Sequence, residues 1–193
     1  MKIMNKLVIF IIILITIIYI NYYKKFNKNF EIIQLSSEKL NNDILHEKLP
    51  ILLEDPISNP NDFINVLFTY EYIFKKKLDY KVNKYSPLVN QNLAYYSIIY
   101  NNNDDDIPIY ISNPKFSNKF KFSKNNSFYY RISNYIVEDE DDINDVQFLK
   151  INLKPKHLII LPSYWLFYLN NDCEMYFLYG FYNLIISFSK ICL

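Results

Sequence analysis

A long apolar run near the N-terminus constrains the fold of this chain more than any other feature. Leu7 to Ile20 contains fourteen residues, and Thr16 is the only polar one. Apolar and aromatic neighbours extend the run to roughly twenty residues, the length that a helix needs to cross a hydrocarbon core of ~30 Å. Lysines flank the run, and tyrosines follow it where an interfacial belt belongs. The sequence therefore predicts a transmembrane anchor over residues 1–25, with membrane-facing positions at Leu7, Ile11, Leu14 and Ile18.

The alternative to a retained anchor is a secretory signal that is cleaved. A signal has a shorter apolar core followed by small residues, whereas Asn-Tyr-Tyr-Lys-Lys follows at 21–25. We therefore expect a single-pass membrane protein, in a host or virion membrane if it is viral, with the lipid bilayer as a partner of the N-terminal helix. Similar numbers of lysines precede and follow the run, so its orientation stays open.

Composition excludes several classes of function. The 21 basic and 20 acidic residues leave a net charge of +1, so the chain has no overall field for holding nucleic acid, and no nucleic-acid partner is expected. The single glycine excludes a glycine-rich phosphate loop. Two cysteines, Cys173 and Cys192, do not make a disulfide framework, and whether they are oxidised stays open.

Two helical segments are expected after a linker over residues 26–39, at the start of a globular domain over 40–193. Ser36 or Ser37 can cap a helix that runs to about Lys48, and a short strand over 51–53 follows. The second helix has Asn59 as its cap and Pro60 in its first turn, and lysines at 75–77 suit its C-terminal end.

The remainder is typical of a β-sandwich or barrel, so the predicted fold class is mainly β with N-terminal helices. In 115–122, phenylalanines and lysines alternate, which favours a half-buried strand over a single-strand nucleic-acid surface. The apolar segment 175–193 is read as buried strand, with a second membrane span as the alternative. The expected strands are 93–100, 107–111, 115–122, 128–137, 146–153, 157–162, 164–169 and 175–188.

Residues that could carry catalysis are few. Neither His46 nor His157 has a carboxylate two positions later, as a non-haem iron site often requires. Cys173 is expected in a turn, where Asp172 and Glu174 would raise the thiol pKa and disfavour a nucleophile. The acidic runs 104–106 and 138–142 lack the spacing of a calcium loop and are read as solvated loops. We predict no metal, no cofactor and no catalytic residue.

One stretch, 153–167, resembles the late-strand signature of cupin-like, JmjC-type domains. In that family Pro-Gly-Asp precedes an apolar strand, a proline, one or two small residues, and then Trp-x-His or Trp-Trp-His. Pro155, the apolar run 158–161, Pro162, Ser163 and Trp165 fit this order. The resemblance implies a cupin-like jelly roll over residues 40–189.

The departures from that signature predict a degenerate site at Phe167, Trp165 and His157. Lys156 and His157 stand where the family has Gly and Asp, and Phe167 stands where it has an iron-binding histidine. A phenyl ring has no lone pair for a metal, so the resemblance does not carry the oxygenase activity to this chain.

We therefore predict a membrane-anchored structural or interaction protein that is not an enzyme. The chain is rich in Ile, Asn, Lys, Tyr and Phe, residues whose codons are AT-rich. This composition and the layout resemble proteins of large DNA viruses, which suggests a virion membrane component. A divergent Fe(II)/2-oxoglutarate-type oxygenase is the alternative, and a tethered carbohydrate or peptide binder is a third hypothesis. The protein partner, the oligomeric state and any true homology stay open.

Overall fold

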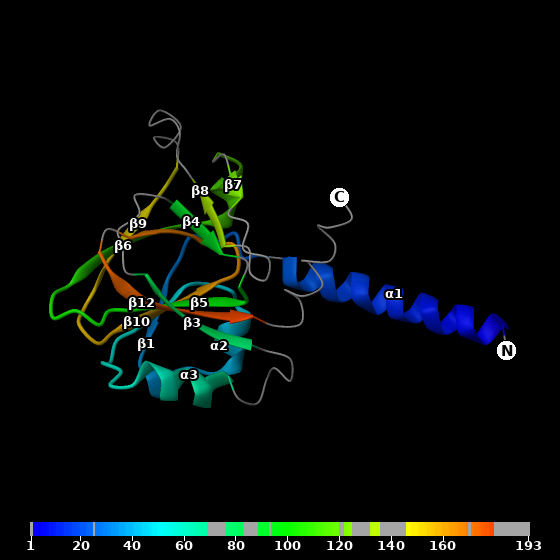
Figure 1. Cartoon of the computed structure of the whole chain (residues 1–193), viewed down its shortest axis with the longest axis horizontal. Coiled ribbons are helices and arrows are strands. Elements are labelled where there is room, and N and C mark those ends of the chain that lie inside the picture. Colours follow the sequence, from blue (N-terminus) through cyan, green and yellow to red (C-terminus); the bar gives the residue numbers. More distant parts are fainter. Residues whose placement is uncertain are drawn as a thin grey trace.

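Two six-stranded sheets face each other and form the body of the molecule (Figure 1). The computed structural model describes residues 2–24, 26–68, 76–82, 89–92, 94–119, 122–124, 132–135, 146–169 and 171–179. The first sheet runs, in order, through β1 (Ile33–Leu35), β2 (Ile51–Leu53), β10 (Leu158–Pro162), β5 (Tyr96–Tyr100), β12 (Cys173–Tyr179) and β3 (Lys76–Val82). The second runs through β7 (Phe122–Lys124), β8 (Ile132–Tyr135), β4 (Val89–Asn92), β11 (Leu166–Leu169), β6 (Ile107–Ser112) and β9 (Leu149–Leu153).

The described strands alternate between the two sheets from β3 to β6 and again from β9 to β12, whereas β6, β7, β8 and β9 all lie in the second sheet. β3, β5, β10 and β12 belong to the first sheet, and β4, β6, β9 and β11 belong to the second. Every described strand pair is antiparallel except β1 with β2, which is parallel. The described chain therefore crosses from one sheet to the other several times.

Helices cover the outer face of the first sheet. They are α2 (Asn42–His46), α3 (Pro60–Phe68) and the 3-10 turn η1 (Ser37–Lys39), which lie beside β1 and β3 in Figure 1. An apolar layer that includes Leu45, Ile64, Tyr96 and Ile160 fills the space between these elements and the sheet. Because the other face of the sheet meets the second sheet, β5 and β10 are buried on both sides, and their sequences are almost continuously apolar.

The prediction of a transmembrane anchor is wrong. The run forms a helix, α1 (Lys2–Lys24), which extends away from the sheets (Figure 1). Across the described ranges no helix is both long enough and apolar enough to span a membrane. The membrane roles given to Leu7, Ile11, Leu14 and Ile18, and the single-pass localisation, are therefore not supported.

The predicted fold class needs a second correction, because the described chain mixes helices and strands around its two sheets rather than being mainly β. The first expected helix is broken into η1 and α2, and Asn41 caps α2 by accepting a hydrogen bond from the Ile44 amide. The second helix keeps its predicted cap, since Asn59 Oδ1 accepts from the Asn61 and Asp62 amides. Lys76 and Lys77, expected at the end of that helix, lie in β3.

The structure also differs from several of the predicted strands. Residues 114–119 form the 3-10 turn η2 (Pro114–Lys119), so the alternation of lysine and phenylalanine there did not mark a strand. β1 lies inside the segment expected to be a linker, and β3 and β4 lie in stretches to which we assigned no strand. Residues 180–193, including Cys192 and most of the alternative second span, lie outside the described residues, as does the acidic run 138–142.

Candidate functional site

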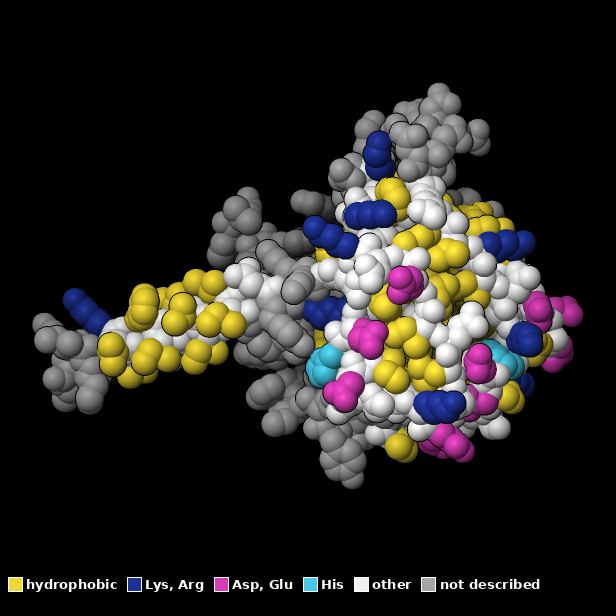
Figure 2. Space-filling model, turned by 180° about the vertical axis from the view of Figure 1, so that it is seen from behind, with side chains coloured by type: hydrophobic (Ala, Val, Ile, Leu, Met, Phe, Trp, Pro, Cys, Tyr) yellow, Lys and Arg dark blue, Asp and Glu magenta, His cyan; other side chains and the backbone are white. Residues whose placement is uncertain are grey.

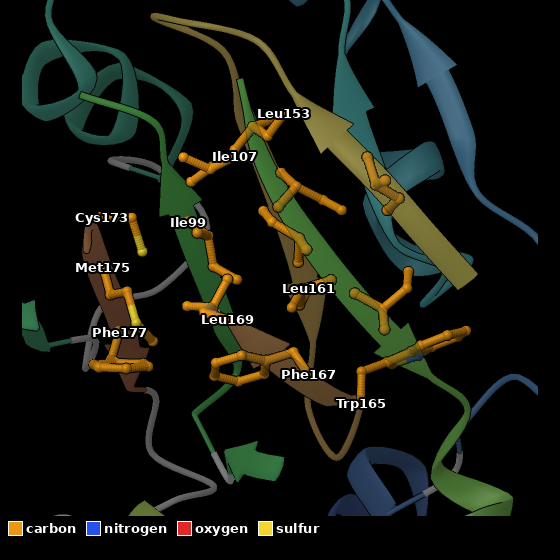
Figure 3. Packing of buried hydrophobic residues seen from close by; sticks show 14 of the residues in the cluster. Ile99, Ile107, Leu153, Leu161, Trp165, Phe167, Leu169, Cys173, Met175 and Phe177 are labelled. Atoms are coloured by element: carbon orange, nitrogen blue, oxygen red, sulfur yellow. The ribbon is translucent and has the colours of Figure 1, made fainter. Parts of the chain in front are cut away.

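The interior of the sandwich near Trp165 and Phe167 is where the resemblance would place an iron centre. Trp165, Phe167 and Leu169 all point into the space between the two sheets, and Leu166 and Tyr168 belong to an apolar cluster on the other face of β11 (Figure 3). Trp165 is 1% exposed and Phe167 is 2% exposed. The alternation expected for this strand is therefore observed.

The Phe167 ring lies among apolar side chains from both sheets. The Phe167 backbone pairs with Asn90 of β4 on one side and Ile111 of β6 on the other, which fixes its register in the second sheet. Figure 3 shows the ring directed toward the first sheet, near Leu169 and below Ile99. The interior cluster also includes Leu161 from β10 and Cys173, Met175 and Phe177 from β12. This packing leaves the family's metal position surrounded by carbon and sulfur atoms.

The turn before β11 is held by hydrogen bonds from three directions. Tyr164 has a left-handed backbone with φ of 72°, and its carbonyl accepts a hydrogen bond from the buried Gln91 amide at 2.7 Å. Ser163 Oγ donates to the Ala94 carbonyl at 2.8 Å. The Trp165 indole N–H donates to the Lys48 carbonyl at 3.3 Å. These bonds hold the turn at Ser163 and Tyr164 and the rotamer of Trp165.

The two histidines do not meet. His46 is the exposed last residue of α2. His157 lies just before β10, where its Nδ1 is 2.8 Å from the Pro155 carbonyl oxygen and its Nε2 is 3.0 Å from the Glu54 carbonyl oxygen. The space-filling view shows the histidines as separate patches (Figure 2). His157 therefore ties the turn before β10 to the end of β2, and both of its ring nitrogens face carbonyl oxygens rather than the interior.

The residues around Phe167 do not fit the iron that the resemblance implies. A 2-His-1-carboxylate centre needs three convergent nitrogen and oxygen donors. In the described part of the chain, no three His, Cys, Asp or Glu side chains gather closely enough to hold a metal ion. The ring of Phe167 and the carbonyl-bound ring of His157 supply no ligand, so we derive no reaction step through iron.

Cys173 lies at the start of β12 rather than in a turn, and it is a buried free thiol. Burial is the main cause that raises the pKa of Cys173 to about 12, and the charges of Asp172 and Glu174 add to it. A thiol with this pKa is almost fully protonated at neutral pH and is a poor nucleophile. The direction predicted from the neighbouring acids is confirmed, although burial contributes more.

A feature that the sequence did not reveal closes the Trp165 end of the interior. Residues 26–32, which we call the strap, connect α1 to β1. Within it the Phe30 ring stacks on the Trp165 indole, with the ring centroids 6.3 Å apart and the planes 5° apart. Asn113, which is fully buried, donates hydrogen bonds from Nδ2 to the carbonyls of Asn27 at 3.2 Å and Asn29 at 2.9 Å. Asn113 carries no sequence signal beyond the turn signal of its Asn-Pro pair.

No known family model matches this sequence, and no curated protein is significantly similar to it.

Proposed function

We propose that this protein is a non-catalytic structural or interaction protein built on a degenerate, cupin-like jelly roll. The observation that carries the proposal is the packing of Phe167, which fills the interior position where the resembled family holds iron. A virion component, the expectation from the codon bias, would be one such scaffold.

The turns around β10 support the cupin-like part of the proposal. Lys156 stands where the family has glycine, and its backbone is left-handed with φ of 63°. Glycine is the usual residue for that conformation, so the turn keeps a glycine geometry without a glycine. Two stacked sheets, between which the chain crosses several times, agree with a double-sheet architecture of this kind.

The described surface of α1 supports an interaction role. Eleven apolar side chains between Leu7 and Ile18 are 44–63% exposed, and apolar side chains cover the visible face of the helix in Figure 2. Contiguous apolar surface of this kind marks an interaction site in proteins. We infer that the partner is a second copy of this chain, because association through this surface would cover the apolar side chains of two helices at once.

Two measurements test the proposal. Metal analysis and anaerobic calorimetric titration with Fe(II) and 2-oxoglutarate should show neither bound iron nor binding heat, because the described residues offer no set of metal ligands. About one iron per chain together with 2-oxoglutarate binding would instead support the divergent oxygenase. Analytical ultracentrifugation should find the full chain associated and a chain beginning at Asn27 monomeric. A full chain that stays monomeric, or that associates only with added lipid vesicles, would overturn self-association through α1.

A further inference from the structure

We propose that the strap, residues 26–32, is a displaceable closure of the Trp165 end of the sandwich, and that it fixes the position from which α1 leaves the domain. Its release would expose Trp165 and free α1 together. This inference concerns the N-terminal segment and does not depend on whether the domain is catalytic.

The first support is that the strap packs on the interior itself. Phe30 and Ile32 are partly buried against the interior cluster, and Phe30 stacks on Trp165. Aromatic pairs of this kind contribute beyond the burial of their area. The Lys115 ammonium lies 6.0 Å from the Phe30 ring centroid, so the Phe30 ring has a second partner. The ring of Phe30 therefore closes the sandwich where Trp165 would otherwise meet solvent.

The second support is a buried side-chain amide whose two described acceptors both lie in the strap. Asn113 Nδ2 donates to the Asn27 and Asn29 carbonyls, and Asn113 Oδ1 accepts from the Lys115 amide at 3.0 Å. A fully buried side-chain amide is costly unless its groups are paired. Removal of the strap would leave both N–H donors without these acceptors, so these bonds favour the closed state.

The third support is that the strap also joins the turn after α2. Asn27 Nδ2 donates to the Glu47 carbonyl at 2.9 Å, and the next residue, Lys48, accepts the hydrogen bond from the Trp165 indole. Asn27 Oδ1 also accepts from the Asn29 amide, which bends the strap locally. One end of the strap therefore contacts the same turn that positions Trp165, while α1 ends at Lys24, only two residues before Phe26. Movement of α1 and exposure of Trp165 are coupled through this short segment.

The variant Asn113→Asp tests the closure with almost no change in shape. The variant keeps Oδ1, which accepts a hydrogen bond from the Lys115 amide. It replaces the Nδ2 group, which donates to the Asn27 and Asn29 carbonyls, by a carboxylate oxygen that cannot donate. We expect the open population, measured by acrylamide quenching of Trp165 and by trypsin cleavage after Lys28, to rise by about tenfold or more. Far-UV circular dichroism of the sheets should remain that of the wild type.

Asn101→Asp is the matched control. Asn101 is equally buried, its Nδ2 donates to the Asp105 and Leu153 carbonyls, and its Oδ1 accepts from the Asn103 amide, but it does not touch the strap. This variant should leave Trp165 quenching and Lys28 cleavage unchanged in the folded state. The closure is refuted if Asn113→Asp behaves as the wild type in both measurements, or if Asn101→Asp opens the strap equally.

Hydrogen exchange of the wild-type chain keeps the proposal testable if Asn113→Asp does not fold. The amides of residues 26–32 should exchange through a local opening, well before those of β5 and β10. Exchange of the strap only together with those central strands would show that it is a fixed part of the core and would overturn the proposal.

Discussion

The indole N–H of Trp165 donates a hydrogen bond to the carbonyl of Lys48, a residue 117 positions earlier in the chain. Lys48 has a left-handed backbone with φ of 54°. Lys156 and Tyr164 are also left-handed, with φ of 63° and 72°. Each of the three carbonyls accepts a hydrogen bond from a distant element, since the Ile57 amide donates to Lys156 and the Gln91 side chain donates to Tyr164. The chain has one glycine, so residues with a Cβ occupy turns that usually take glycine.

Replacement of Lys156 by glycine should therefore stabilise the protein. The left-handed conformation costs a residue with a Cβ about 1–2 kcal/mol, and the greater chain entropy of glycine in the unfolded state offsets part of this gain. We expect Lys156→Gly to raise the free energy of unfolding by about 0.5–1 kcal/mol, as measured by urea denaturation. Lys154→Gly is the control, because Lys154 has the same side chain and exposure but no positive φ. It should destabilise, and equal effects at both positions would contradict the strain argument.

Truncation of Trp165 to alanine should lower the free energy of unfolding by about 3–5 kcal/mol, since the indole is buried in the interior cluster. The variant has no tryptophan, so unfolding is followed by far-UV circular dichroism. Trp165→Phe keeps an aromatic ring beside Phe30 and loses the hydrogen bond to Lys48, and its cost should be smaller, about 1 kcal/mol for that bond. Alanine and phenylalanine variants of equal stability would show that packing of the indole contributes little.

Local patterns predicted local features of this protein well. The caps at Asn59 and the strands after Pro50 and His157 follow from residues close in sequence, and so does the placement of Trp165, Phe167 and Leu169 on one face. The prediction of a membrane span over residues 1–25 is wrong, because no helix among the described residues is both long enough and apolar enough to cross a membrane.

Long-range relationships were not predictable. The strap depends on Asn113 reaching Asn27 and Asn29, more than 80 positions away, and no spacing rule connects them. The same holds for β1, whose three residues become a strand only because β2 offers a parallel edge. The 3-10 turn over 114–119 shows the opposite case, in which tertiary context overrode a clear alternation.

The thiol of Cys173 should be almost unreactive in the folded protein. A pKa of about 12 in place of 9.0 lowers the thiolate fraction at pH 8 by about 1,000-fold. We expect the Cys192→Ser variant, which leaves Cys173 as the sole thiol, to react with Ellman's reagent only as fast as the protein unfolds. Because the folded pKa is raised, the contribution of this thiol to stability is complete below pH 9 and is lost as the pH rises toward 12. Fast stoichiometric labelling at pH 8 without denaturant would contradict the burial of Cys173.

Asp55 should make stability depend on acid pH. Burial alone would raise the pKa of Asp55, but hydrogen bonds from the Ser37 hydroxyl and amide, with a smaller effect of His157, hold it below its usual value of 3.8. A lowered folded pKa means that the carboxylate stabilises the fold above about pH 4, and that this contribution is lost as the pH falls through the folded value. Asp55→Asn should therefore flatten the loss of stability measured by urea denaturation between pH 5 and pH 3. Identical pH profiles for the variant and the wild type would show that Asp55 does not contribute to the loss of stability in acid. Asp62→Asn is a suitable control, since Asp62 is an exposed acid on the adjacent α3.

Phe167 offers the sharpest test of how the interior is used. Phe167→His restores the residue type that the resembled family places there. His46 is on the surface and His157 contacts the carbonyls of Pro155 and Glu54, so neither histidine faces the new imidazole. We expect no Fe(II) binding by anaerobic titration. The free energy of unfolding should fall by about 2–4 kcal/mol, because a polar ring replaces a phenyl group in an apolar layer. Phe167→Leu is the control that removes aromatic volume without adding polarity, and it should cost about 1–1.5 kcal/mol. Binding of one iron per chain by Phe167→His would mean that further ligands converge on this position. The interpretation that apolar side chains fill the interior around residue 167 would then be wrong.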